Sequence, residues 1–375
     1  MSWPVPLSVL DLSPVPTGAT TGEALRRTLD LARHVEEWGY QRFWVAEHHN
    51  MPGIASSAPA VLAGQVAAAT STLRVGSGGV MLPNHAPLVV AEQFGMLEGL
   101  FPGRIDLGIG RAPGTDQVTA LALRRRVAAL SADEFPEQLS ALLGFFEGDH
   151  EEGVVDQGTV ATSIGPSEGI GPSEGRVGRR VRAIPAEGNQ PAVWLLGSSG
   201  YSAQVAGFLG LPFAFAHHFA AANTDAALEL YRRSFRPSAR LTEPYCLIGV
   251  AVVCAPDAEE ARYLHGSAQL SMLRLRTGRP STLPSPEEAA DYPYGEGDRA
   301  LIARATGSHV VGDPRGVIDE LERLVARTGV DELMITTNVY DHAARLRSFR
   351  LVAEGVSRTP RSEDTDGAGR DRLAP

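Results

Sequence analysis

The sequence predicts an α/β protein that folds as a (β/α)8 TIM barrel. Along its 375 residues, short apolar runs alternate about eight times with segments of helical periodicity, which is the pattern of repeated βα units. The apolar runs lack a regular polar face, as expected for parallel strands that are buried on both sides. No GxGxxG pattern follows the first run, which disfavours an open dinucleotide-binding sheet. Eight such units in a chain of this length favour a closed barrel.

The first half of the chain contains four of these units. Thr20 and Glu23 form a capping-box pattern at the start of the first helix, and Gly39 stands where a glycine commonly ends one. Between them, Leu25 and Leu29 begin an apolar stripe at helical spacing. We expect strands at 7–12, 43–46, 73–81 and 105–109, and further helices at 58–70, 88–100 and 136–146.

A segment without apolar periodicity interrupts the alternation at 148–182. It contains the hexapeptide IGPSEG twice in tandem, so we expect a disordered-looking, low-complexity insertion that acts as a passive surface loop. The barrel pattern then resumes, which predicts one domain over 1–355 and a flexible tail at 356–375. We expect strands at 193–196, 213–216, 246–254 and 332–336. One helix should follow the turn after residue 196 and end at 209, and further helices are expected at 225–235, 257–275, 313–328 and 342–353. A polar, proline-rich stretch occupies 276–298.

Composition excludes several partners and chemistries. The net charge of −10 argues against nucleic acid or an anionic membrane as a partner. The chain contains no lysine, which excludes lysine Schiff-base chemistry and a lysine-containing P-loop. Cys246 and Cys254 lie in one apolar run and are expected to be buried free thiols. Few cysteines, and no basic-then-apolar signal segment at the start, predict a cytoplasmic protein, and no apolar run is long enough to span a membrane.

Small polar residues follow the expected strand at 193–196 and lead into a helix. A helix N-terminus presents free N–H groups and positive potential to an anion, and serine hydroxyls add donors, so this turn predicts a phosphate site. An ordinary helix cap also favours serine but needs fewer small residues. Arg111, after the strand at 105–109, either pairs with the same phosphate or forms a surface ion pair. The residues of the turn are Ser198, Ser199, Gly200, Tyr201 and Ser202.

Two further strand ends carry candidate residues. His48 follows the second strand and suits a general base near neutral pH, although a histidine held by backbone carbonyls would be purely structural. Gly78 and Gly79 end the third strand, where they either admit the edge of a flat ligand or allow tight packing in the barrel. We expect no metal site, because the adjacent pairs His48-His49 and 217–218 lack the spacing of ligands on a helix.

At these residues the chain resembles the bacterial-luciferase-like flavin monooxygenase family, and within it the single-gene members. The resemblance runs from about Pro6 to Phe349. Its most specific pieces are WVAEHHN, VGSGGVMLP, GRIDLGIGRA, and LLGSS followed by GLPF. It implies a TIM barrel with an FMN-type flavin across the carboxyl-terminal rim.

The resemblance also implies roles for individual residues. His48 would be the catalytic base or proton donor, and Arg111 would hold the flavin phosphate together with Ser198, Ser199 and Ser202 in the turn. A non-proline cis peptide would lie at Gly78–Gly79, and 276–298 would be the counterpart of the mobile lid. Gly110 stands where the light-emitting subunit has a reactive cysteine, so light emission is not implied.

The resemblance predicts an FMN-dependent monooxygenase. Reduced FMN would come from a separate flavin reductase, because no nicotinamide-binding segment is visible, and O2 would oxygenate a small organic substrate, aldehyde-like or other. Trp194, Phe219 or the lid at 276–298 would shape the substrate pocket, and we expect a homodimer. Two alternatives stay open at this point, a dehydrogenase using the deazaflavin F420 on the same barrel and a non-catalytic flavin-binding protein.

Overall fold

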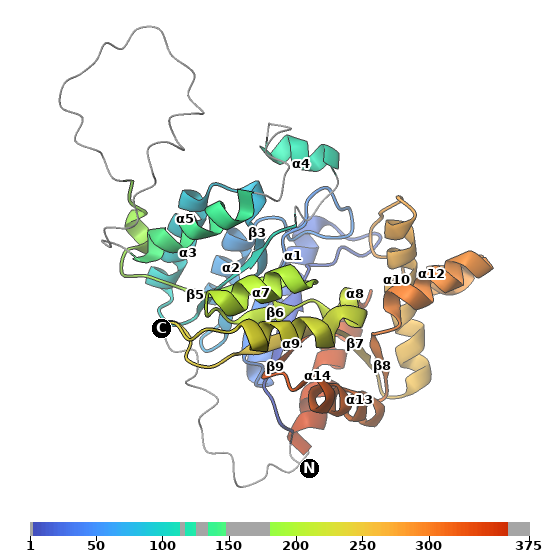
Figure 1. The fold of residues 1–375 in the computed structure, drawn as a ribbon. Coiled ribbons are helices and arrows are strands. Elements are labelled where there is room, and N and C mark those ends of the chain that lie inside the picture. Colours follow the sequence, from blue (N-terminus) through green and yellow to red (C-terminus); the bar gives the residue numbers. More distant parts are fainter. Residues whose placement is uncertain (1–2, 113–116, 125–133, 148–180, 359–375) are drawn as a thin grey trace, which may run out of the picture.

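The structure, a computed structural model, describes residues 3–112, 117–124, 134–147 and 181–358. It contains nine strands in one parallel sheet, with helices around the outside (Figure 1). The strands are β1 (Leu7–Asp11), β2 (Arg42–Val45), β3 (Arg74–Met81), β4 (Ile105–Gly110), β5 (Ala192–Gly197), β6 (Phe213–Phe215), β7 (Cys246–Cys254), β8 (Val310–Gly312) and β9 (Glu332–Thr336).

Eight of the nine strands close into a barrel. Strands β1 to β7 pair in sequence order, β7 pairs with β9, and β9 pairs with β1. These eight are the strands expected from the sequence, so the (β/α)8 prediction is confirmed. The three-residue strand β8 lies outside the ring and pairs only with the end of β7.

The helices and 3-10 turns fill the connections. The α-helices are α1 (Thr21–Glu37), α2 (Pro59–Ala69), α3 (Pro87–Leu100), α4 (Gln117–Arg124), α5 (Phe135–Glu147), α7 (Gly200–Phe208), α8 (His217–Ala220), α9 (Thr224–Ser234), α10 (Ala258–Arg276), α11 (Pro286–Asp291), α12 (Glu296–Thr306), α13 (Pro314–Thr328) and α14 (His342–Arg358). The 3-10 turns are η1 (Leu82–Asn84), η4 (Ile184–Ala186) and η5 (Ala221–Asn223). No helix within the described ranges is long and apolar enough to cross a membrane.

The capping box and the terminal glycine predicted for α1 are both present in the structure. The backbone N–H of Glu23 donates to the Thr20 hydroxyl at 3.2 Å, and the Glu23 carboxylate accepts from the Thr20 backbone at 2.7 Å. Gly39 has a φ of 80°, a left-handed conformation that favours glycine after a helix. Cys246 and Cys254 are buried free thiols, also as expected.

The stretch at 276–298 differs from the irregular polar segment that its composition suggested. It contains α11 and the start of α12, and it is tied to the loop after β1, because the backbone N–H of Leu283 donates to Val15 at 2.8 Å and Thr17 donates back at 2.9 Å. Ile302 of α12 and Ala289 of α11 pack against Leu270 and Leu273 of α10. This tertiary contact stabilises helices whose own apolar pattern is too short to identify them.

The expected insertion at 148–182 lies outside the described residues except for its last two. The expected tail at 356–375 lies outside them from residue 359 onward. Helix α14 continues to Arg358, three residues beyond the predicted end of the domain.

Among the buried apolar clusters of the described residues, the two largest stabilise the barrel. The larger one lies between the strands and the surrounding helices, as Val9, Val75 and Leu333 illustrate. The smaller one fills the interior, where Trp194 packs edge-on between Trp44 and Tyr245 at centroid distances of 5.2 and 5.7 Å. Trp194 is therefore fully buried inside the barrel.

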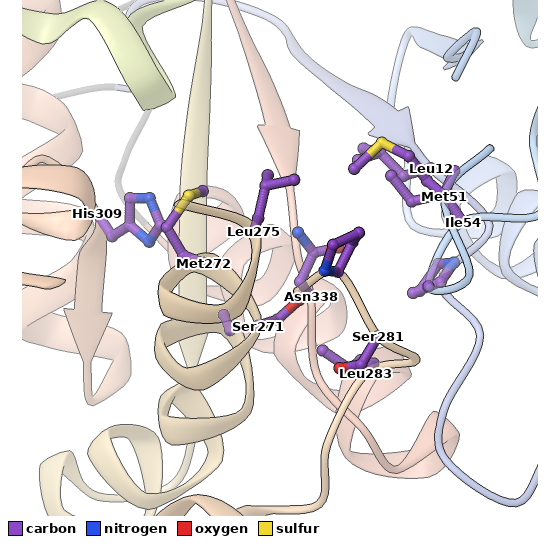
Figure 2. Close-up of a pocket in the computed structure, with 14 residues that line it drawn as sticks. Leu12, Met51, Ile54, Ser271, Met272, Leu275, Ser281, Leu283, His309 and Asn338 are labelled. Atoms are coloured by element: carbon purple, nitrogen blue, oxygen red, sulfur yellow. The ribbon is translucent and has the colours of Figure 1, made fainter. Parts of the chain in front are cut away.

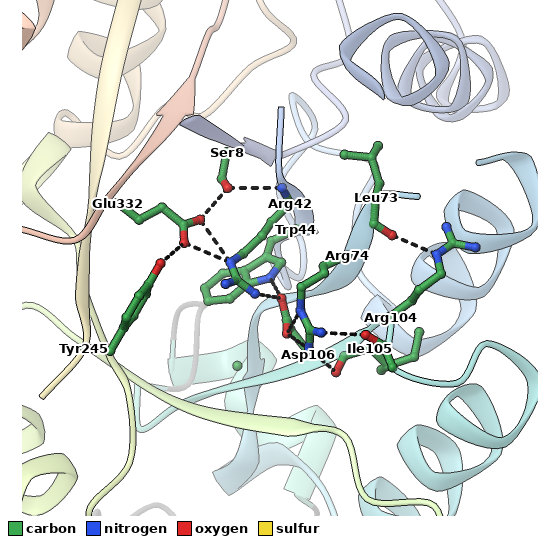
Figure 3. A network of polar contacts seen from close by, with 12 residues as sticks. Ser8, Arg42, Trp44, Leu73, Arg74, Arg104, Ile105, Asp106, Tyr245 and Glu332 are labelled. Carbon is green, nitrogen blue, oxygen red and sulfur yellow. Dashed lines mark hydrogen bonds and ion pairs between the residues drawn. The ribbon is translucent and has the colours of Figure 1, made fainter. Parts of the chain in front are cut away.

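A buried ionic network lies at the amino-terminal ends of the strands (Figure 3). Arg42 donates to Asp106 and to Glu332, each at 3.0 Å, and the three side chains are at most 1% exposed. Arg74 donates to Asp106 at 2.7 Å, and Tyr245 donates to Glu332 at 2.9 Å. Burial acts to raise the pKa of Asp106, but the guanidinium groups of Arg74 and Arg42 outweigh it and hold the pKa below its usual value. Two arginines and two carboxylates thus balance in charge inside the barrel.

Candidate active site

The sequence-predicted site residues lie at the opposite, carboxyl-terminal end of the barrel. Parallel strands all end at one rim, so loops far apart in the sequence become neighbours there. His48 follows β2, Gly78–Gly79 lies near the end of β3, Arg111 follows β4, and the serine-rich turn joins β5 to α7.

Arg111 and the first turn of α7 are in direct contact. The guanidinium carbon of Arg111 lies 4.3 Å from the centroid of the Tyr201 ring, in a cation–π arrangement. No carboxylate of the described residues pairs with Arg111, so the alternative of a surface ion pair finds no support within that part of the chain. The fold therefore places a cation beside the N-terminus of a helix.

The small residues of the turn have different environments. Ser199 is the exposed N-cap of α7, and its hydroxyl makes no capping hydrogen bond, while Ser198 is half-buried beside it. Ser202 is only 4% exposed and packs against the end of β5, since a Cβ added at Gly197 would lie 2.5 Å from the Cβ of Ser202. Ser198 and Ser199 are thus open to a ligand, whereas Ser202 sits within the helix–strand contact.

The peptide between Gly78 and Gly79 is cis, as the resemblance implied. A Cβ added at Gly78 would lie 2.6 Å from Leu10, and one added at Gly79 would lie 2.7 Å from the carbonyl oxygen of Gly108. Tight packing against β1 and β4 therefore explains both glycines without a ligand.

His48 is half-buried, and its Nδ1 makes no hydrogen bond in the described structure. Its backbone N–H donates to the carbonyl of Ser56 at 3.0 Å, which anchors the loop but leaves the ring free. Burial lowers the pKa of His48, and the opposing effect of Glu47 does not cancel this. The imidazole is therefore neutral near pH 7.

Glu47 is a site residue that the sequence did not identify. Its carboxylate is completely buried and accepts hydrogen bonds from His49 and His85, each at 2.9 Å, from Asn84 at 3.2 Å and from the Met81 backbone at 3.0 Å. Burial acts to raise its pKa, but the hydrogen bonds from His85 and its other partners hold the pKa below the usual value. Glu47 thereby ties the loop that carries His48 to the segment after β3.

Three further histidines lie near the rim, His218 in α8, His265 in α10 and His309 just before β8. The Nδ1 of His218 lies 3.2 Å from the carbonyl of Gly249, and the Nε2 of His265 lies 2.9 Å from the Nδ1 of His309. Burial lowers the pKa of each of these three histidines to about 4. Among the residues that the structure describes, no group of three or more His, Cys, Asp or Glu is arranged to hold a metal ion.

These neutral histidines predict acid sensitivity. Between pH 6.5 and about 4 the unfolded chain binds protons at these positions and the folded chain does not, so the free energy of unfolding should fall as the pH falls through this window. Each histidine should contribute a slope of up to about 1.4 kcal/mol per pH unit.

The His265→Gln variant tests this expectation in urea titrations across pH 4.5–8. Its unfolding free energy should depend less steeply on pH than that of the wild type below pH 6.5, whereas the two slopes should agree above pH 7. Equal slopes below pH 6.5 would show that His265 is protonated equally in the folded and unfolded states.

Beside these histidines, a pocket opens at the rim between β1 and α10 (Figure 2). Its walls come from the segments after β1, β2 and β9, from α10, from the stretch before α11, and from the residue just before β8. Neither Phe219 nor Trp194, the two aromatic residues expected to shape the substrate pocket, lines this pocket. Phe219 is 52% exposed and lies edge-on to His218, and Trp194 is buried in the barrel interior. The stretch at 276–298, which the sequence named as a candidate, contributes Pro280, Ser281 and Leu283 to the wall. The sequence did not identify the other wall residues, because no single motif contains them.

Comparisons with known proteins agree with this architecture. A family model described as luciferase-like monooxygenase matches residues 5–332. The Bacillus subtilis (strain 168) protein YvbT is 50% identical over 348 residues, which are 93% of this chain and 96% of that protein. An Escherichia coli (strain K12) protein named luciferase-like monooxygenase is 44% identical over 350 residues, with coverage of 93% and 96%. The crystal structure of apo-MsnO8 has 35% sequence identity and a TM-score of 0.82, and the match covers 95% of this chain and 100% of that one.

More distant solved structures share the fold. The oxygenating constituent of 3,6-diketocamphane monooxygenase from Pseudomonas putida, solved in complex with FMN, has 18% identity and a TM-score of 0.67 over 95% of this chain and 98% of that one. An F420-dependent secondary alcohol dehydrogenase has 14% identity and a TM-score of 0.64 over 95% and 99%. The whole-length matches above are far stronger than these, and they establish that the chain belongs to the luciferase-like monooxygenase family.

Proposed function

We propose that this chain is an FMN-dependent monooxygenase that uses reduced FMN and O2 to oxygenate a small organic substrate. The contact between Arg111 and the first turn of α7 is the observation that carries the proposal. A phosphate monoester has a charge of about −1.5 to −2 near pH 7, and a guanidinium beside free helix N–H groups suits such an anion. The FMN complex of the diketocamphane monooxygenase, which has the same fold, is consistent with this assignment.

The residues present fit a flavin mononucleotide. Arg111 and the turn at Ser198 and Ser199 would hold the phosphate, and the buried, unpaired Nδ1 of His48 faces no protein partner within the described chain. When bound and reduced, the flavin supplies the electrons that activate O2. His48, neutral near pH 7, can hold or move a proton at Nδ1, and Glu47 keeps the loop of His48 in place. The apolar wall of the rim pocket limits access of water.

We further propose that a separate reductase supplies reduced FMN and that the chain forms a homodimer. The sequence contains no nicotinamide-binding fingerprint after its first strand. Helices α2 and α3 expose large apolar side chains, including Val61 at 68%, Met96 at 55% and Leu100 at 65%. Such a face on two adjacent helices supports an association surface.

The Arg111→Ala variant tests the phosphate site. Loss of a charge-assisted contact of about 1.5–3 kcal/mol should raise the dissociation constant for FMN about 10–100-fold without unfolding the protein. Riboflavin lacks the phosphate and should bind the wild type and the variant alike. Arg233→Ala, at an exposed position on α9, is the matched control and should leave the affinity for FMN unchanged.

Two results would contradict the proposal. An equal loss of riboflavin and FMN affinity in Arg111→Ala would mean that Arg111 does not contact the phosphate. Protection of the protein against thermal unfolding by F420 but not by FMN would replace the proposed cofactor and favour a dehydrogenase.

A further inference from the structure

The rim pocket has a chemical character that the proposed function does not specify. Its volume is about 130 Å³, close to that of engineered cavities of about 150 Å³ that bind benzene. Figure 2 shows α10 on one side and the segments after β1 and β2 on the other. The labelled apolar side chains around it are Leu12, Met51, Ile54, Met272, Leu275 and Leu283.

No Arg, Asp or Glu among the described residues lines this pocket. Arg274 of α10 donates a hydrogen bond to the hydroxyl of the wall residue Ser281 at 3.3 Å. Its charge is neutralised by an ion pair with Glu288 at 2.6 Å. Among the described wall residues, His309 is the one titratable group, and burial lowers its pKa to about 4, which favours its neutral form. A charged ligand would therefore lose its hydration without gaining an opposite charge.

The polar groups of the wall are neutral. Asn338, which follows β9, is half-buried and makes no hydrogen bond within the described part of the chain. Figure 2 places its amide between the α10 wall and the loops after β1 and β2. An amide offers both a donor and an acceptor, so it can orient a neutral polar group on a mainly apolar molecule.

We propose that this pocket selects a neutral, mainly apolar substrate of about the size of one substituted six-membered ring, oriented by Asn338. The assignment rests on the proposed monooxygenase function, because it takes this pocket as the place where the organic substrate binds. It adds a prediction of its own, which is discrimination against carboxylates and ammonium ions of the same shape.

Three probes of similar size test the charge preference. They are 1-ethyl-4-(methylthio)benzene, 4-(methylthio)benzoate and 4-(methylthio)benzylammonium, and their binding to the full-length, FMN-loaded protein is measured by calorimetry in the absence of reductant. The neutral sulfide should bind about tenfold or more tightly than either charged probe, because the pocket cannot compensate a buried charge. Equal affinity for the benzoate and the neutral sulfide would overturn the proposal.

Two variants change the charge of the pocket in opposite directions. Met272→Arg should shift the preference toward the benzoate by about tenfold or more, and the nearly isosteric Asn338→Asp should shift it toward the benzylammonium. Ala326→Arg, on the exposed face of α13, is the matched control and should leave the preference of the wild type intact. Unchanged preferences in both pocket variants would mean that the probes bind elsewhere.

The chemistry is then measured separately with reduced FMN and O2. One oxygen atom would pass to the sulfur as a sulfoxide and the other would become water, with two electrons and two protons from reduced FMN. One outcome is that the neutral sulfide binds tightly and the two variants shift the charge preference as predicted, but no sulfoxide forms from it or from other neutral probes. This outcome would count against the monooxygenase function and leave the pocket assignment standing. Sulfoxide formed equally well from the charged probes would overturn the pocket assignment and leave the proposed function standing.

Discussion

Replacing His48 with alanine is expected to lower turnover by about 10²–10⁴-fold, the usual contribution of a general acid or base. The ring is half-buried at the rim, its Nδ1 has no hydrogen-bond partner in the described structure, and its backbone N–H bonds Ser56 through an atom that the substitution retains. FMN affinity should change little, because the proposed phosphate site is built from other loops. Single-turnover kinetics with pre-bound reduced FMN measure the effect on the chemical steps directly.

The pH profile supplies an independent readout for His48. Burial lowers its pKa below the usual 6.5, so the neutral form should persist at pH 6.5 and the single-turnover rate should fall only at lower pH. The residual rate of His48→Ala should lack this decline. A variant rate equal to that of the wild type would remove His48 from the mechanism, and an acid limb that survives in the variant would assign that limb to another group.

The second large effect is expected in stability. Arg42→Met should lower the free energy of unfolding by about 3–5 kcal/mol, because it leaves Asp106 and Glu332 buried with one cation fewer. Arg74 remains beside Asp106. Among the described residues, the remaining side-chain donors to the Glu332 carboxylate are the hydroxyl groups of Ser8 and of Tyr245, the latter at 2.9 Å. Urea titration near pH 7 measures the loss.

A double variant separates the charge effect from packing. Arg42→Met combined with Glu332→Gln removes both members of one pair, and it should recover a large part of the stability lost in the single variant. Recovery would identify the uncompensated carboxylate as the cause. If the double variant is as unstable as the sum of the two single variants, the loss comes from the packing of Arg42 against Trp194, whose ring centroid lies 5.0 Å from the guanidinium.

Local sequence signals predicted most of the fold. The eight barrel strands and most of the helices around them follow from apolar runs, capping residues and glycines, because these signals act over a few residues. The elements that were missed, among them α4, α11, α12 and β8, are short or weakly patterned. Ile302 of α12, for example, finds its apolar partners on α10, about thirty residues away in the sequence.

Part of the candidate site was also predictable from local sequence signals, and part was not. His48, Arg111 and the turn at Ser198 and Ser199 stand directly after strands, and the closed parallel sheet brings every such position to one rim. The glycine-rich end of β3 was ambiguous in the sequence. The structure explains it by close packing, since neighbouring backbone and side-chain atoms leave no space for a Cβ at Gly78 or Gly79.

The sequence by itself therefore determined the barrel, the rim and the types of residue at each strand end, because all of these depend on local periodicity and on the rule that parallel strands end together. Tertiary structure alone decided which groups are neutral and which are paired. Glu47 accepts hydrogen bonds from residues up to 38 positions away, and Arg42 reaches Glu332 across 290 positions. The pKa of a buried group and the polarity of a pocket depend on such distant neighbours, and a pattern of nearby residues does not record them.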